Sequence, residues 1–358
     1  MSENPGGKMG PGGLTYAAAG VDIAAGEQAV ESMKDLVRST YRPEVMGDIG
    51  GFGGLFRVPA GYRSPVLVAA TDGVGTKLAV AQAVGRLDTV GIDLVAMCVD
   101  DLVCQGASPL FFLDYQAHGD LSPAVVIELM KGIASGCRQA GCAILGGELA
   151  AHPGVLGPGE FDLVGFAVGI VEADQVLDGS SVAAGDVLVG LLSPGLRSNG
   201  YSLARRALLD VGGRGLDSPA WPGAARSLGE ELLEPSVIYA PAVVGLLEVL
   251  GPAVHAVAHI TGGGLGGNLP RVLRPGLEAV VRRGSWPVPR IFAEVQRTGA
   301  VSDDEMGRVF NLGLGMVAAV APDRADEAVA VLTRAGVDVA LIGEVVTGDP
   351  HRSGVTLV

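Results

Sequence analysis

The stretch at residues 69–77, AATDGVGTK, concentrates side chains that could bind a metal-bound polyphosphate. It follows an apolar, strand-like run at 66–70 and contains Thr71, Asp72, Gly73, Gly75, Thr76 and Lys77. Glycines let a backbone approach a ligand closely, a carboxylate can hold Mg²⁺, and a lysine can neutralise phosphate. The order differs from a P-loop, in which the hydroxyl residue follows the lysine. From these residues alone, a nucleotide loop and an ordinary strand-to-helix turn with capping residues are equal alternatives.

The segment 89–105 predicts a largely buried helix that carries three carboxylates in nine residues, Asp93, Asp100 and Asp101. They fall on roughly one helical face together with Met97 and Cys104. Buried carboxylates need partners, and the surrounding residues are apolar. We favour a Mg²⁺ site here over the alternative, in which the carboxylates pair with a distant arginine or with capping N–H groups.

Two glycine-rich segments in the first half offer further binding sites. The sequence GDIGGFGG at 47–54 contains five glycines in eight residues, Gly50, Gly51, Gly53 and Gly54 among them. Such a loop could cradle phosphate or be a simple turn, and its phenylalanine favours a loop that docks on something. Glu148 follows two glycines after a short buried strand at 143–145, where α/β proteins place ligands. Taken alone, Glu148 is better explained as a turn glutamate that faces solvent.

The second half carries two comparable motifs. Ser198, Asn199 and Gly200 open a predicted helix directly after Arg197, which suits an anion or a plain N-cap. The sequence HITGGG at 259–264 follows a predicted strand. It brings together His259, Thr261, Gly262, Gly263 and Gly264. Three consecutive glycines favour close approach to a phosphate, with a flexible turn as the alternative.

The alternation of elements predicts an α/β or α+β fold with mixed strands in two domains. We expect a flexible tail at 1–14, an N-terminal domain at 15–172 and a C-terminal domain at 173–358. The predicted helices lie at 26–39, 78–85, 89–105, 122–140, 201–211, 238–250, 268–273 and 324–335. The predicted strands lie at 66–70, 110–115, 143–145, 161–171, 186–192, 254–260, 279–282, 312–320 and 339–345.

Composition excludes several classes of function. Hydrophobic residues make up 48% of the 358 positions and charged residues 18%, yet charges or Gly/Pro clusters interrupt every apolar run before it could span a membrane. The formal net charge is −14 without a basic cluster, so we expect no nucleic-acid partner. The four cysteines sit in apolar surroundings without a CxxC, which predicts buried thiols. The start lacks a signal peptide's apolar core, and we expect a cytoplasmic protein.

Taken together, these motifs resemble the aminoimidazole ribonucleotide synthetase family, also called phosphoribosylformylglycinamidine cyclo-ligases. The resemblance runs from about residue 15 to 345. It is carried by YAAAGVDI (16–23), RPEVMGDIGGFGGLF (42–56), TDGVGTKL (71–78), GIDLVAMCVDDLVCQGASPLFFLDY (91–115), GGE (146–148), SNGYSL (198–203), HITGGG (259–264), NLPRVL (268–273) and FNLGLGM (310–316).

The resemblance implies an ATP- and Mg²⁺-dependent ring closure of formylglycinamidine ribonucleotide. It also implies a homodimer in which the N-terminal sheets pair and a C-terminal α/β sandwich completes the substrate site. By position, Asp72, Asp93 and Asp101 would hold Mg²⁺, and catalysis would involve Asp72, Lys77, Arg197 and His259. The nucleotide would contact Lys34, Thr71–Gly73, Gly75–Lys77, Asp93, Asp101, Glu148 and the glycines at 50–54. The substrate would meet Ser198–Gly200 and Thr261–Gly264.

The sequence departs from the family pattern at four positions. Leu149 replaces a threonine, Ala151 a glutamate and Arg197 a histidine, while Asp100 stands where many members have asparagine. Arg197 can neutralise phosphate but cannot act as a base. Two alternatives to the purine cyclo-ligase therefore stay open. One is a paralogue that activates a different amide or amidine, and the other is a non-catalytic nucleotide-binding homologue.

Overall fold

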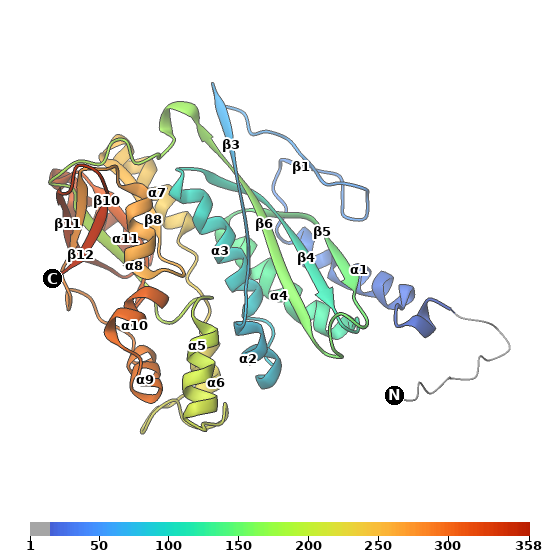
Figure 1. Ribbon diagram of the computed structural model, residues 1–358. Helices are drawn as coiled ribbons and strands as arrows, with labels where there is room; N and C mark the ends of the chain where they lie inside the picture. Colours follow the sequence, from blue (N-terminus) through green and yellow to red (C-terminus); the bar gives the residue numbers. More distant parts are fainter. Residues whose placement is uncertain (1–14) are drawn as a thin grey trace.

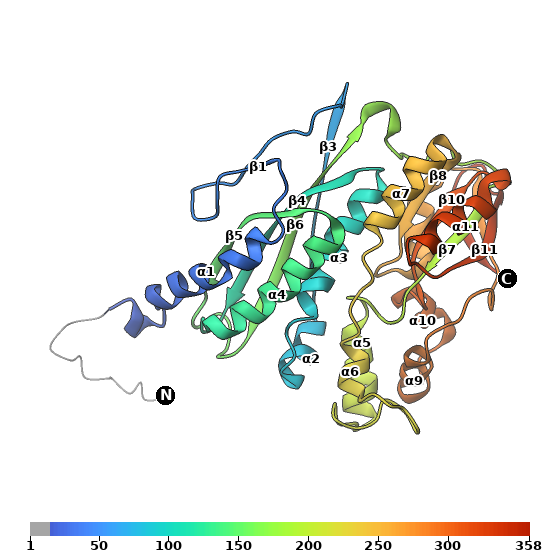
Figure 2. The ribbon, with the colours of Figure 1, turned by 180° about the vertical axis from the view of Figure 1, so that it is seen from behind.

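The computed structural model describes residues 15–358, so the tail predicted at 1–14 lies outside the described residues. The first half forms a four-stranded sheet in the order β3-β6-β4-β5, and helices cover one of its faces (Figures 1 and 2). The strands are β3 (Pro65–Gly73), β6 (Phe161–Glu172), β4 (Ser108–His118) and β5 (Ala143–Ala151). The helices are α1 (Ile23–Arg38), α2 (Lys77–Val84), α3 (Val90–Cys104) and α4 (Pro123–Ala140), and β1 (Val45–Met46) pairs with β2 (Leu55–Phe56).

Glycines let α3 and α4 pack with their backbones almost in contact. A Cβ atom on Gly91 of α3 would lie 2.3 Å from the backbone nitrogen of Ile133 in α4. A Cβ atom on Gly136 of α4 would lie 2.9 Å from Cβ of Val95. Because neither space admits a side chain, the helix pair can lie deep against the sheet, and α3 is buried over almost its whole length.

The second half forms a six-stranded sheet in the order β12-β9-β11-β7-β10-β8. Its strands are β7 (Val187–Leu192), β8 (Val254–His259), β9 (Leu277–Val281), β10 (Leu314–Val320), β11 (Val339–Thr347) and β12 (Gly354–Leu357). Its helices are α5 (Tyr201–Arg205), α6 (Leu228–Leu232), α7 (Ala240–Leu250), α8 (Gly264–Asn268), α9 (Arg290–Gly299), α10 (Asp303–Val309) and α11 (Ala325–Arg334). Only β12 and β9 pair in parallel among the neighbours in this sheet.

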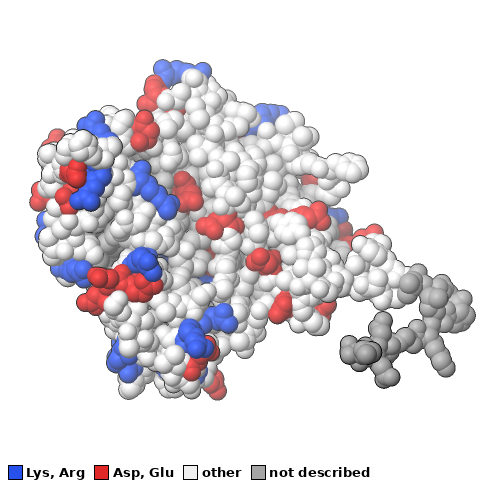
Figure 3. All heavy atoms as spheres, viewed as in Figure 1, with Lys and Arg blue, Asp and Glu red and all other residues white. Residues whose placement is uncertain are grey.

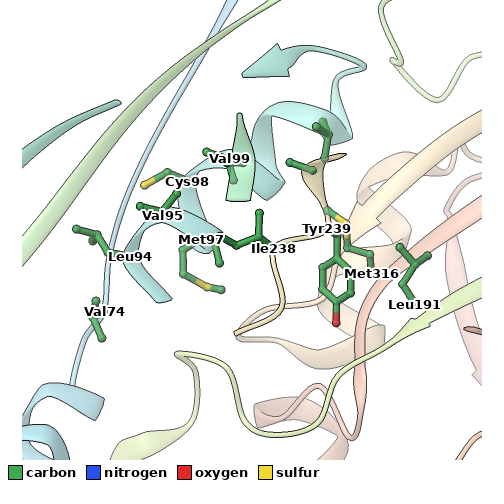
Figure 4. Close-up of a cluster of buried hydrophobic side chains, with 14 of the residues drawn as sticks. Val74, Leu94, Val95, Met97, Cys98, Val99, Leu191, Ile238, Tyr239 and Met316 are labelled. Atoms are coloured by element: carbon green, nitrogen blue, oxygen red, sulfur yellow. The ribbon is translucent and has the colours of Figure 1, made fainter. Parts of the chain in front are cut away.

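A continuous apolar core joins the two halves. Helix α3 packs against α7 and β8, and its side chains belong to the same buried cluster as residues of the second half. Figure 4 shows Met97 of α3 beside Ile238, and Tyr239 beside Met316 of β10. Since α3 is buried by both sheets, the polar residues that it carries lie between the two halves of the chain.

Among residues 15–358, no helix lies over the second face of the four-stranded sheet (Figure 1). Leu67 of β3 is 59% exposed, Val164 and Phe166 of β6 are 39% and 38% exposed, and Tyr115 of β4 is 36% exposed. Figure 3 shows few charged side chains over this part of the surface. We call these four residues the open sheet face.

The predicted class of mixed α/β structure is confirmed, and the helices expected at 89–105 and 122–140 end within one residue of α3 and α4. Three strands extend well beyond their predicted bounds: β3 continues through Gly73, β4 runs from Ser108 to His118, and β5 continues through Ala151. Glu148 therefore lies inside a strand, because pairing with β4 keeps the glycines before it extended. The predicted helix at 201–211 changes to a π-helical turn after Arg205, and α9 and α10 were not predicted. No helix in the described part is long and apolar enough to cross a membrane.

Candidate functional site

A row of residues at one level of the four-stranded sheet connects the motifs of the first half. Asp72 of β3 lies opposite Gly165 of β6, which lies opposite Asp114 of β4, and Asp114 lies opposite Gly147 of β5. Residues directly opposite on neighbouring strands direct their side chains to the same face. A Cβ atom on Gly147 would lie 2.3 Å from Oδ1 of Asp114, so this position requires glycine.

A pocket opens beside this row, between α1, α4 and the loop at 48–54. Its walls combine apolar side chains, loop glycines and polar groups. The lining residues are Val30, Met33, Val37, Asp48, Ile49, Gly50, Gly51, Gly53, Gly54, Asp114, Gln116, Met130, Ile144, Leu145, Gly146, Gly147, Glu148 and Leu149. The structure thus brings the predicted glycines together with Glu148 in one place, which we call the glycine-loop pocket.

Ion pairing and close packing hold the loop of this pocket. The carboxylate of Asp48 accepts hydrogen bonds from the Arg38 guanidinium and from the Tyr41 hydroxyl. The Arg38 contact lowers the pKa of Asp48 to about 2. Gly54 lies against Leu145, where a Cβ atom would come within 2.4 Å of Cγ. Lys34, predicted at the nucleotide site, pairs with Glu31 on the same helix and is not among the described residues that line the pocket.

Lys77 and Asp93 form an ion pair that is completely buried. Nζ of Lys77 lies 2.6 Å from Oδ2 of Asp93, and both side chains are 0% exposed. Nζ also donates to the backbone carbonyls of Arg197 and Glu234, while Oδ1 of Asp93 accepts from the backbone N–H and hydroxyl of Ser236. Burial lowers the pKa of Lys77, and the Asp93 charge opposes this effect. The structure therefore places neither group at an opening, in contrast to the predicted phosphate and Mg²⁺ contacts.

Arg197 is also held inside the protein, whereas we expected it to neutralise a phosphate. It is 1% exposed, and its NH2 group lies 2.7 Å from the Asp100 carboxylate and 3.1 Å from Nε2 of His259. The other oxygen of Asp100 accepts the backbone N–H groups of residues 239 and 240 at the start of α7. Although burial alone would lower the pKa of Arg197, the Asp100 carboxylate raises it, and the net direction is upward. The backbone φ of +62° at Arg197 is unusual for a residue with a side chain.

His259 connects this buried pair to Asp101. A guanidinium only donates hydrogen bonds, so Nε2 of His259 accepts from Arg197 and the ring proton lies on Nδ1. Nδ1 then donates to Oδ1 of Asp101 at 2.8 Å. Both ring nitrogens have protein partners, so in this arrangement His259 orients Asp101 and does not face an open site. The side chain of Asp101 is 47% exposed.

Asp72 and Asp101 are the predicted metal ligands that the structure leaves accessible. Partial burial raises the pKa of Asp72, and the negative charge of Asp101 raises it further. The Asp101 charge acts on Asp72, whereas Asp93 is already neutralised by Lys77. No group of three or more His, Cys, Asp or Glu side chains suited to a metal gathers within residues 15–358. The side-chain hydroxyl of Thr76 forms a hydrogen bond with that of Ser202, in the second half of the chain.

The two motifs of the second half, at 198–200 and 262–264, lie next to each other. A Cβ atom on Gly262 would lie 3.2 Å from Oδ1 of Asn199, so the glycine loop at 262–264 and the segment at 198–200 are neighbours. The side-chain amide of Asn268 donates to the carbonyls of Thr261, Gly262 and Gly264 and so fixes this loop. Ser198 carries a buried hydroxyl with no hydrogen-bond partner among the described residues.

Sequence reasoning missed several polar residues that shape these sites. Asp48, Asp114 and Gln116 line the glycine-loop pocket, Ser236 fixes Asp93, and Asn268 fixes the second glycine loop. One signal was available in the sequence. Asp114 stands in the apolar strand LFFLDY, where a buried carboxylate needs an explanation.

Comparison with known proteins assigns the family. The model for the AIR synthase related protein, N-terminal domain, matches residues 56–171, and the model for its C-terminal domain matches residues 183–355. A phosphoribosylformylglycinamidine cyclo-ligase from Trichlorobacter lovleyi is 53% identical over 332 residues, or 92% of this chain and 94% of that protein. A second cyclo-ligase, from Anaeromyxobacter sp. (strain Fw109-5), is 55% identical over 336 residues, or 94% of this chain and 96% of that protein.

This chain belongs to the phosphoribosylformylglycinamidine cyclo-ligase family. The resemblance found in the sequence motifs is thereby confirmed, and as a member of the cyclo-ligase family the chain is an enzyme of the ligase class. The cyclo-ligase fold is shared with more distant proteins. A thiamine-monophosphate kinase from Stenotrophomonas maltophilia K279a superimposes with a TM-score of 0.68 at 20% identity, over 91% of this chain and 95% of that one. Hydrogenase maturation protein HypE, solved in complex with ATP, superimposes with a TM-score of 0.64 at 18% identity, over 92% of this chain and 90% of that one.

Proposed function

We propose that the chain closes the imidazole ring of formylglycinamidine ribonucleotide, using ATP, to give aminoimidazole ribonucleotide, ADP and phosphate in de novo purine biosynthesis. The observation that carries this proposal is identity above 50% to the two cyclo-ligases over more than nine-tenths of the chain. The chemistry needs ATP because a formamide oxygen is a poor leaving group. Phosphorylation of this oxygen lets the amidine nitrogen attack the same carbon, after which phosphate leaves and the ring closes.

The glycine-loop pocket suits the nucleotide. Its apolar walls can cover a flat base, and its loop glycines let the backbone approach phosphate oxygens. The nucleotide complex of HypE supports a nucleotide-binding role for this fold. The row from Gly147 to Asp72 places the pocket and the accessible Asp72 carboxylate at the same level of one sheet.

Asp72 and Asp101 fit Mg²⁺ bound together with the phosphates of ATP. Mg²⁺ is usually held by one or two carboxylates and completed by phosphate oxygens and water, so two accessible carboxylates suffice. Burial and the Asp101 charge both raise the pKa of Asp72, and a divalent cation would stabilise its ionised form. Mg²⁺ would neutralise the charge that develops on the transferred phosphoryl group. The buried ion pair of Lys77 and Asp93 supports this site by tying the start of α2 to the first turn of α3.

The substrate phosphate is proposed to bind at the second glycine loop. Gly262–Gly264 and Asn199 lie together, and the backbone at Gly263 and Gly264 has positive φ values of 103° and 59°. Ser198, whose hydroxyl has no described partner, adjoins this place. His259 and Arg197 position Asp101 between this loop and the nucleotide. The chain is further proposed to work as two domains, 15–172 and 173–358, as a cytoplasmic homodimer paired through the open sheet face.

The proposal is tested by phosphate release from ATP with formylglycinamidine ribonucleotide. Release with this substrate supports a purine cyclo-ligase, release only with another amide or amidine supports a paralogue, and no release with any of them supports a non-catalytic homologue. Asp72→Asn is expected to abolish Mg²⁺-dependent release while the circular dichroism spectrum and thermal melt stay unchanged. The matched control is Asp174→Asn, since Asp174 lies on the surface beside Arg63. Unchanged turnover in Asp72→Asn would exclude this carboxylate as a ligand.

A further inference from the structure

Two polar side chains lie deep in the glycine-loop pocket. Asp114 and Gln116 alternate along β4, so both point to the face of the sheet that α1 and α4 cover. Their exposed fractions are only 7% and 2%. The lining of the pocket beside them also includes apolar side chains such as Met130 and Ile144. Neither polar residue has a role in the ion pairs that join the two halves of the chain.

The amide of Gln116 is fixed in one orientation. Its Nε2 donates to Oδ2 of Asp114 at 2.7 Å. Burial raises the pKa of Asp114 to about 6, so the carboxylate is mostly ionised at pH 7 and above and can only accept hydrogen bonds. Rotating the amide by 180° would place its oxygen against this carboxylate. Asp114 therefore dictates that Oε1 of Gln116 points away from it.

Oε1 of Gln116 is a buried acceptor without a donor among residues 15–358. Leaving such a group unsatisfied destabilises a protein, and native structures contain few of them. The residue lines the pocket, so a donor can come from a molecule that occupies it. One N–H of the same amide remains available when the other donates to Asp114. The unused part of Gln116 is thus an acceptor beside a donor.

We propose that Gln116, oriented by Asp114, reads the base of the bound nucleotide and selects a 6-aminopurine. This inference rests on the proposed function, in which ATP occupies the glycine-loop pocket. Oε1 accepts from the exocyclic amino group, and the remaining N–H of Nε2 donates to the adjacent ring nitrogen. A 6-oxopurine presents an acceptor to Oε1 and an N–H to Nε2, so both contacts become repulsive. The Asp114 carboxylate prevents the amide from rotating to accommodate it.

The test compares ATP with inosine triphosphate as the phosphoryl donor for the full-length enzyme. We expect kcat/KM for ATP to exceed that for inosine triphosphate by at least about tenfold, because the mismatch leaves buried polar groups unpaired. Gln116→Met keeps the side-chain length but removes both hydrogen-bonding groups. It is expected to reduce the preference to less than about threefold, mainly through a higher KM for ATP.

A second variant tests the orienting role of Asp114. In Asp114→Asn the neighbouring amide can donate as well as accept, so Gln116 can rotate, and KM for inosine triphosphate is expected to fall. Gln139→Met is the matched control, because Gln139 is exposed on α4 and its amide bonds Ser135 on the same helix. If Asp114→Asn unfolds, the dissociation constants of both nucleotides for the wild type and for Gln116→Met decide the matter.

The outcomes separate this inference from the proposed function. A wild-type enzyme that uses both nucleotides equally, or a Gln116→Met enzyme that keeps the full preference for ATP, overturns the base-reading role and leaves the cyclo-ligase proposal intact. Absence of phosphate release from either nucleotide with every amide contradicts the proposed function itself. Loss of the preference in Gln116→Met together with an unchanged Gln139→Met confirms the inference.

Discussion

Replacing Lys77 by methionine distinguishes a buried structural charge from a phosphate ligand. Lys77→Met preserves the length and apolar body of the side chain but leaves the Asp93 carboxylate without its cation. Both side chains are 0% exposed, so solvent cannot compensate. Removing one partner of a buried pair costs roughly 3–5 kcal/mol. The two carbonyls that accept hydrogen bonds from Nζ also lose their donor. Because these bonds belong to the same buried network as the ion pair, this cost already includes their loss.

The expected effect can be followed by thermal unfolding. Unfolding entropy scales with chain length, and for a chain of this size it is about 0.75 kcal/mol/K if both halves unfold together. A loss of about 4 kcal/mol then lowers Tm by roughly 5 °C. The double variant Lys77→Met with Asp93→Asn removes the uncompensated charge and is expected to recover about half of this loss. Lys131→Met is the control, because Lys131 pairs with Glu128 at the surface and should change stability by less than about 1 kcal/mol.

One result would refute this reasoning. If Lys77→Met melts like the wild type but has lost phosphate release from ATP, Lys77 contacts a phosphate group and the buried arrangement is not the working one. A variant with a lower Tm and no gain from the second substitution would show that the carboxylate of Asp93 is not the group left uncompensated. Both measurements use the full-length protein.

Two further predictions concern the pocket and the assembly. Gly54→Ala would place a Cβ atom 2.4 Å from Cγ of Leu145, so the loop must shift, and we expect at least about tenfold weaker ATP binding by calorimetry. Gly26→Ala, on α1 with open space around it, should leave binding unchanged. Phe166→Glu introduces a charge on the open sheet face and is expected to convert dimers to monomers in size-exclusion chromatography with light scattering. Val211→Glu, exposed in the second half, is its control, and an unchanged mass for Phe166→Glu would place the interface elsewhere.

The sequence alone determined the class of fold, most element positions and the family. Apolar periodicity located α3 and α4 because their burial requires a helical pattern of side chains, and local pattern is what a sequence displays. Long ordered motifs such as TDGVGTK and HITGGG identified the relatives. The same local reading ended the predicted strand at Leu145, since glycine is a poor strand former, whereas pairing with β4 extends the strand through Gly146 and Gly147.

Only the tertiary structure decided which carboxylates are free. Asp93, Asp100 and Asp101 look alike in the sequence, and all three were candidates for a metal or for a distant partner. The partner of Asp100 is Arg197, 97 residues away, and the pairing depends on how α3 packs between two sheets. Burial with a cation neutralises Asp93 and Asp100, while Asp101 stays half exposed. Charge pairing between distant segments requires coordinates in space, and spacing along the chain does not contain them.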